Sequence, residues 1–218
     1  MDAKTLDRMM PILRREYARF PMPIVTQYSQ VRRDPFKILI STLISLRTKD
    51  AVTAEASKEL FALADTPDRM RRLSLVAIER AIYPAGFYRN KARTIVYVCN
   101  ELIERFEGKV PDDLDQLLTM KGVGRKTANL VVTLGFNKPG ICVDTHVHRI
   151  SNRFGLVRTK TPDETEMALR KKLPPKYWIE YNDLLVTYGQ NVCKPISPHC
   201  SECKIARWCE RIGVAKSR

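Results

Sequence analysis

Residues 121–129 have the sequence KGVGRKTAN, and residues 143–146, VDTH, follow shortly after them. Two glycines separated by one residue allow a tight turn in which backbone amides can come close to a ligand. Amides at the start of a helix, with basic side chains beside them, favour an anion such as a phosphate. The stretch therefore predicts two short helices joined by an anion-binding turn.

The composition of the 218-residue chain suits a partner that carries many phosphates. Lysine and arginine number 38 against 24 aspartates and glutamates, so the formal net charge is +14, and the pI is about 9.7. Such a charge is typical of nucleic-acid-binding surfaces, with a merely soluble basic protein as the alternative. No apolar run is long enough for a membrane span, and the first residues, MDAK, do not resemble a signal peptide. We therefore expect a cytoplasmic protein, associated with the nucleoid of a prokaryotic cell.

Helical start and stop signals recur along the chain, whereas the alternation typical of strands does not. Three segments pair an N-cap residue with proline at the first helical position: Asp34-Pro35, Thr66-Pro67 and Thr161-Pro162. Glu164 is placed for a capping box with Thr161. Residues 92–106 carry an apolar stripe at helical spacing, and Gly108 follows as a stop. The sequence predicts an all-α fold of ten or so short helices with short connections.

The glycine turn is expected to hold the backbone of DNA. Its amides and the start of the following helix would face a phosphate, and two basic side chains would add positive charge. Such contacts position a duplex without reading its sequence. A plain helix connector is the alternative for a lone Gly-x-Gly turn, but the basic flanks favour DNA. The residues expected to contact DNA here are Lys121, Gly122, Val123, Gly124 and Arg125.

Lys126 and Asp144 are the candidate catalytic pair. Lys126 lies at the start of the helix expected over residues 127–136, where positive charge is disfavoured and the uncharged, nucleophilic amine is favoured. Such an amine can displace a base from the anomeric carbon of a nucleotide and form a Schiff base with the opened sugar. Asp144 can stabilise positive charge on the sugar and handle the proton of the amine. A solvated surface lysine and an ordinary helix N-cap are the alternatives.

Four of the six cysteines have the spacing C-x6-C-x2-C-x5-C. Thiolates so close in sequence can hold one metal centre, and the spacing is neither that of a zinc ribbon nor that of a ferredoxin. A four-cysteine cubane iron–sulfur cluster fits best, tetrahedral zinc is the alternative, and disulfides are disfavoured in the cytosol. Cys99 and Cys142 lie in apolar contexts that are typical of a core. The expected ligands are Cys193, Cys200, Cys203 and Cys209.

The glycine turn with its lysine, the VDTH stretch and the four-cysteine loop together resemble the endonuclease III family, iron–sulfur DNA glycosylases and abasic-site lyases of the helix-hairpin-helix superfamily. The resemblance covers nearly the whole chain, from about Asp34 to Cys209. It implies Lys126 as the Schiff-base nucleophile, Asp144 as the essential carboxylate and a [4Fe–4S] cluster on the four cysteines. It also places His146 among the residues that contact DNA.

The resemblance further implies an all-α fold of two lobes, with DNA bound across the cleft between them. One lobe would be a six-helix barrel over residues 28–138, with the helix-hairpin-helix at about 112–136. The other would join residues 1–27 to residues 139–218 and carry the cluster in the loop 193–209. Members of the family are expected to act as monomers.

Two more residues are implied to enter the DNA when the damaged base is flipped out of the stack. By the pattern of the family, Arg47 fills the gap that the base leaves, and Phe87 wedges the stack open. Core packing is the alternative for Phe87. Glutamine is common in the family where Arg47 stands, and Leu-Pro is common where this chain has Met120-Lys121.

The sequence thus predicts a bifunctional DNA glycosylase and AP lyase of base excision repair. It would excise oxidised or otherwise damaged pyrimidines from double-stranded DNA and cleave 3′ to the abasic site by β-elimination. One alternative is a monofunctional mismatch glycosylase acting on thymine, uracil or adenine, but such relatives typically lack the nucleophilic lysine. The other is a non-catalytic iron–sulfur module that binds DNA with steep salt dependence and leaves abasic sites intact.

Overall fold

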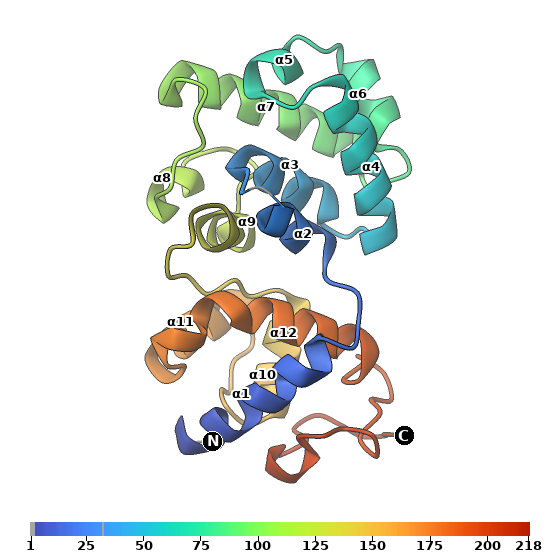
Figure 1. The fold of residues 1–218 in the computed structure, drawn as a ribbon, viewed down its shortest axis with the longest axis vertical. Coiled ribbons are helices and arrows are strands. Elements are labelled where there is room, and N and C mark those ends of the chain that lie inside the picture. Colours follow the sequence, from blue (N-terminus) through green and yellow to red (C-terminus); the bar gives the residue numbers. More distant parts are fainter. Residues whose placement is uncertain (1–2, 32) are drawn as a thin grey trace. The chain divides into compact units, whose positions relative to one another are not determined.

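The computed structural model describes residues 3–31 and 33–218, and all regular secondary structure in this part of the chain is helical (Figure 1). The prediction of an all-α fold is therefore confirmed. The chain forms two compact units, one of Ile24–Lys138 and one of Pro139–Arg218 together with the N-terminal segment that ends at Pro23. The described helices include none with the length and apolar character that a membrane span requires. The expected division into a barrel domain and a cluster domain stays a prediction.

The Ile24–Lys138 unit is built around one apolar helix. Its elements are α2 (Ile24–Val31), α3 (Pro35–Ser45), α4 (Asp50–Leu63), α5 (Pro67–Arg71), α6 (Leu75–Ile82), α7 (Tyr88–Phe106), α8 (Leu114–Leu118), α9 (Arg125–Leu130) and the π-helix η1 (Val131–Gly135). Helix α3 packs against α2, α4, α7, α9 and η1. Since a helix surrounded on all sides has no polar face, α3 buries a nearly continuous run that includes Ile38, Leu39, Ile40, Leu43 and Ile44.

The other unit is discontinuous in sequence. Its elements are α1 (Ala3–Tyr17), α10 (Thr145–Arg153), α11 (Pro162–Lys172), α12 (Trp178–Asn191) and the 3-10 turns η2 (Pro175–Tyr177) and η3 (Ala206–Trp208). Figure 1 shows the blue α1 against the orange α12. Leu6, Met9 and Leu13 of α1 share a core with Tyr181 and Leu185 of α12. Each such side chain contributes about 1.5–3 kcal/mol on burial, so α1 is an integral part of this unit.

The helix starts follow the signals in the sequence with one correction. Each of the three predicted N-cap side chains accepts a hydrogen bond from the amide three residues later: Asp34, Thr66 and Thr161. The capping box expected at α11 is wrong in its second half, because Glu164 accepts from the amide of Lys160, at 2.9 Å, one residue before the cap. Gly108, with φ of +74°, directly follows the C-cap of α7 and ends the helix as expected.

The helix after the glycine turn also differs from the prediction of one helix over residues 127–136. Helix α9 begins at Arg125 and ends at Leu130, and the chain continues as the π-helix η1. The π conformation is rare and occurs frequently at functional sites. At its end Gly135 lies against Pro35 of α3, and a Cβ there would come within 3.3 Å of the proline. The wider turn therefore accompanies close packing on the central helix.

Candidate functional site

The glycine turn joins α8 to α9 in the Ile24–Lys138 unit. Gly122 has φ of +90°, a conformation that glycine adopts without strain, and a Cβ there would lie 2.4 Å from Cγ2 of Thr94 in α7. Val123 is buried and anchors the turn. Lys121, Gly122 and Gly124 are exposed, so the turn presents its glycine backbone and one lysine to solvent.

Lys126 is the second residue of α9 and is partly buried. The following residues Thr127 and Ala128 are buried, and the side-chain amide of Asn129 donates to the carbonyl of Arg125 at 3.0 Å. These contacts fix the first turn of the helix. The structure thus places the Lys126 amine on an anchored helix start, directly after the exposed turn.

Asp144 begins α10 in the discontinuous unit. Its Oδ1 accepts hydrogen bonds from the amides of His146 at 2.8 Å and Val147 at 2.9 Å, so the expected N-cap is present. Both bonds use the same oxygen, which gives the carboxylate one fixed orientation. Arg149 donates through Nη2 to Nδ1 of His146 at 3.1 Å and to the carbonyl of Cys193 at 2.8 Å. The helix that carries Asp144 is therefore tied to the cysteine loop.

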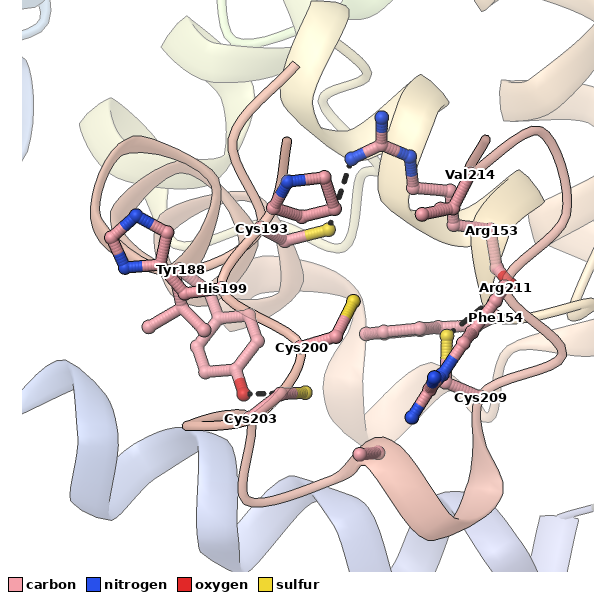
Figure 2. A pocket seen from close by; sticks show the side chains of 13 residues that line it. Arg153, Phe154, Tyr188, Cys193, His199, Cys200, Cys203, Cys209, Arg211 and Val214 are labelled. Carbon is pink, nitrogen blue, oxygen red and sulfur yellow. Dashed lines mark hydrogen bonds between the residues drawn. The ribbon is translucent and has the colours of Figure 1, made fainter. Parts of the chain in front are cut away.

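The four predicted metal ligands line one cavity in the C-terminal loop. Figure 2 shows the sulfur atoms of Cys193, Cys200, Cys203 and Cys209 around this common space. All four are free thiols in the structure. Cys99 and Cys142 are buried in apolar cores, as the sequence predicted.

The four thiols are a donor set that either a tetrahedral zinc ion or an iron–sulfur cubane can use. Tetrahedral zinc requires every thiolate sulfur to lie about 2.3 Å from a single centre. Among the described residues, no group of three or more His, Cys, Asp or Glu side chains is arranged to hold a metal ion. A cubane binds each cysteine through a different iron, so its ligands stand farther apart around a larger space. The four free thiols that line the shared cavity would supply the four ligands that a cubane needs.

Two side chains that the sequence reasoning missed support the cysteine loop. Arg153 of α10 is 7% exposed and donates to Sγ of Cys193 at 3.4 Å and to the carbonyl of Pro195 at 2.7 Å. Tyr188 of α12 donates from its hydroxyl to Sγ of Cys203 at 3.1 Å. Hydrogen bonds to cysteine sulfur orient a ligand and tune a cluster. The arginines at 149 and 153, one turn apart on α10, are the signal that sequence reasoning could have used.

The environment of the cavity changes how its side chains bind protons. Burial raises the pKa of the Cys203 and Cys209 thiols, so a metal centre has to displace their protons when it binds. Burial also raises the pKa of Tyr188, which keeps its hydroxyl a donor toward Cys203. A metal centre bound to this loop would therefore release protons.

Arg47 and Phe87 lie on two loops of the Ile24–Lys138 unit and are both exposed. Phe87 is 62% exposed, so the alternative of core packing is wrong. The guanidinium carbon of Arg47 lies 5.7 Å from the centroid of the Phe87 ring, within the range of a cation–π contact. The structure therefore brings together the two side chains that the family pattern implied for entry into DNA.

Comparison with known proteins decides the family. Residues 40–175 match the family described as HhH-GPD superfamily base excision DNA repair protein. Endonuclease III of Thermotoga maritima is 49% identical over 177 residues, which cover 81% of this chain and 83% of that protein. The chain belongs to the endonuclease III family. The resemblance predicted from the three sequence motifs is therefore confirmed.

Further likenesses agree with membership of the endonuclease III family. Endonuclease III of Bacillus subtilis is 37% identical over 180 residues, covering 82% of each chain. A solved structure described as a trapped endonuclease III–DNA covalent intermediate, in an estranged-adenine complex, matches with a TM-score of 0.83 and 36% identity. That match covers 97% of both chains.

Proposed function

We propose that this endonuclease III family member is a bifunctional DNA glycosylase and AP lyase of base excision repair. It acts as a monomer on damaged double-stranded DNA, in the cytoplasm at the nucleoid. The observation that carries the proposal is Lys126, an amine on an anchored helix start directly after an exposed glycine turn. The related endonuclease III that was trapped in a covalent complex with DNA supports a nucleophile of this kind.

The proposed reaction starts with the turn holding a backbone phosphate while the damaged nucleotide leaves the stack. The uncharged amine of Lys126 attacks the anomeric carbon, the glycosidic bond breaks, and the base departs with the electron pair and takes up a proton. Opening of the sugar leaves a Schiff base between Nζ and this carbon. Loss of a proton from the neighbouring carbon then expels the 3′ phosphate by β-elimination, and water releases the enzyme.

Asp144 is the proposed partner of the amine. Since the α10 amides hold Oδ1, the second oxygen is the one that serves the substrate. It accepts the proton that the amine loses and stabilises the positive charge that develops on the sugar as the base leaves. The proposed substrates are oxidised or otherwise damaged pyrimidines, in line with the family resemblance.

The four cysteines are the proposed ligands of a [4Fe–4S] cluster. When bound, the cluster would hold residues 193–209 in shape and present the exposed Lys204 and Arg207 to DNA phosphates. Neither base removal nor β-elimination transfers electrons, so the proposed role is structural. Purified protein should contain iron and acid-labile sulfide in equal amounts, and Cys203→Ser should lower both. Zinc in place of iron would overturn this part of the proposal.

Reduction with borohydride tests the lysine. Wild-type protein should become covalently joined to a duplex with thymine glycol or an abasic site, and it should nick the abasic strand. Lys126→Gln should abolish trapping and nicking while keeping the helical circular dichroism. Lys109→Gln is the matched control, because this lysine is 83% exposed and lies outside the glycine turn.

The outcomes separate the rival functions. Trapping that survives Lys126→Gln would overturn the role of this residue. Release of free base by the wild type without any nicking would instead indicate a monofunctional glycosylase. Binding of DNA without either reaction would leave the non-catalytic module as the remaining function.

A further inference from the structure

Four described non-glycine residues of the Ile24–Lys138 unit have a left-handed backbone conformation. Glu107 and Asn137 lie where α7 and η1 end, whereas Arg47 and Phe87 lie on the two loops that are implied to enter DNA. Arg47, between α3 and α4, has φ of +53°, and Phe87, just before α7, has φ of +58°. Side chains other than glycine, asparagine and aspartate rarely adopt this left-handed region. Such conformations persist where the surrounding structure fixes them, and they cluster at functional sites. Something on the inner side of the two loops must therefore hold them.

The buried Lys91 is the group that meets both loops. It lies in the first turn of α7, where its amide donates to the carbonyl of Phe87 at 3.1 Å. Its Nζ donates to the carbonyl of Ile44 at 2.6 Å and to Oγ1 of Thr48 at 2.7 Å. Ile44 and Thr48 stand on either side of Arg47 in sequence. One amine therefore ties both ends of the Arg47 turn to the helix that starts next to Phe87.

Thr48 adds a second connection between the loops. Its Oγ1 accepts the amide of Gly86 at 3.1 Å as well as the amine of Lys91, and its own proton is directed to the carbonyl of Leu46 at 3.4 Å. A Cβ on Gly86 would lie 2.7 Å from the carbonyl oxygen of Arg47, so the two backbones touch. The hydroxyl of Thr48 thus uses its one donor and both of its acceptor positions, and it connects the two loops by hydrogen bonds.

Burying the amine of Lys91 costs free energy, because the amine loses its contacts with water. Lys91 is 7% exposed, and burial lowers its pKa to about 8. Its two oxygen partners are neutral, so they provide no opposite charge. A methionine, whose side chain is nearly as long, would fill the space without this desolvation. The two hydrogen bonds offset part of this cost.

We propose that Lys91 is a positioning residue which, together with Thr48, locks the Arg47 and Phe87 loops into one rigid element. The two side chains then enter the DNA stack as a unit while the damaged nucleotide is extruded. This inference rests on the proposed function. It predicts that the lock matters where a base must be removed from a paired stack and matters much less at a site that has already lost its base.

The test compares two substrates under single-turnover conditions: a duplex with a paired oxidised pyrimidine and a duplex with a preformed abasic site. Lys91→Met should lower base release from the paired lesion about tenfold or more, because small misplacement of positioning groups has effects of that size. Nicking of the abasic duplex should stay within about threefold, since no stacked base opposes extrusion. Lys109→Met, at the exposed surface of the same unit, should leave both rates unchanged.

If Lys91→Met fails to fold, variants of Thr48 test the same proposal. Thr48→Val removes the shared hydroxyl at equal size and should show the same split between substrates, and Thr48→Ser should restore the wild-type ratio. A fluorescent base analogue opposite the lesion should report slower unstacking in Lys91→Met and Thr48→Val. Equal losses on both substrates, or no loss on either, would overturn the positioning role. A wild type that cannot nick abasic DNA would instead refute the proposed function, and this inference with it.

Discussion

At the scale of single residues, Asp144 combines helix capping with a proposed chemical role, and substitution can separate them. Asp144→Asn keeps a good N-cap, so its free energy of unfolding should stay within about 0.5 kcal/mol of wild type, whereas Asp144→Ala should lose about 1 kcal/mol. Both should lower base release about 10²-fold or more, because neither carries the carboxylate. Denaturant unfolding and single-turnover assays measure the two effects. If Asp144→Asn kept the turnover of the wild type, Asp144 would act only as a helix cap and not in the chemistry.

Lys91 makes stability depend on pH in the alkaline range. Burial lowers the pKa of its amine from 10.5 to about 8. Between these values the unfolded chain binds a proton at this site that the folded chain does not, so the free energy of unfolding rises with pH. Relative to Lys91→Met, the wild type should gain at most about 3 kcal/mol across this window. Urea titrations of both proteins at a series of pH values measure the gain, and a constant difference would contradict it.

At the scale of elements, the two glycines of the hairpin have different tasks. Gly122 has φ of +90° and a clashing neighbour, so Gly122→Ala should lower the free energy of unfolding by about 1–3 kcal/mol. Gly124 has φ of −90° and open space around its Cα, so Gly124→Ala should change stability by less than about 0.5 kcal/mol. Its methyl group should still weaken duplex binding, because it stands where a phosphate would approach. Chemical denaturation and fluorescence anisotropy separate the two, and equal destabilisation would contradict the assignment.

The helices were predictable where the deciding contact is local. Asp34 and Thr66 cap their helices through amides three residues away, and a short stretch of sequence contains both partners. The π-helix Val131–Gly135 was missed because it accompanies contact with Pro35, a residue distant in sequence. A pattern of neighbouring residues cannot predict a contact with a residue so distant in sequence.

In the candidate site, too, residues in local motifs were predictable, whereas residues that act through long-range contacts were not. Lys126, Asp144 and the cysteines belong to compact motifs, so the sequence could nominate them. Lys91 could not be nominated, because its partners lie 43 and 47 residues earlier and one is a backbone carbonyl. Every residue has a backbone carbonyl, so the sequence does not show which carbonyl accepts a hydrogen bond from Lys91. The family pattern pointed to Arg47 and Phe87 but not to the group that holds them.

At the scale of the whole molecule, the net charge of +14 should govern affinity for DNA. Each phosphate contact releases counterions, so the logarithm of the binding constant should fall linearly with the logarithm of salt concentration. Lys121→Ala should reduce the magnitude of this slope by about 1 and weaken binding equally for all sequences. Anisotropy titrations over a range of KCl concentrations measure the slope. An unchanged slope would show that Lys121 contacts no phosphate.

The discontinuous unit has a consequence for synthesis in the cell. Helix α1 leaves the ribosome before α12. Helix α12, which packs against the apolar face of α1, is translated only after the entire Ile24–Lys138 unit. At about 5–20 residues per second, that face stays uncovered on the nascent chain for about 10–30 s. During this interval α1 is a natural target for a chaperone.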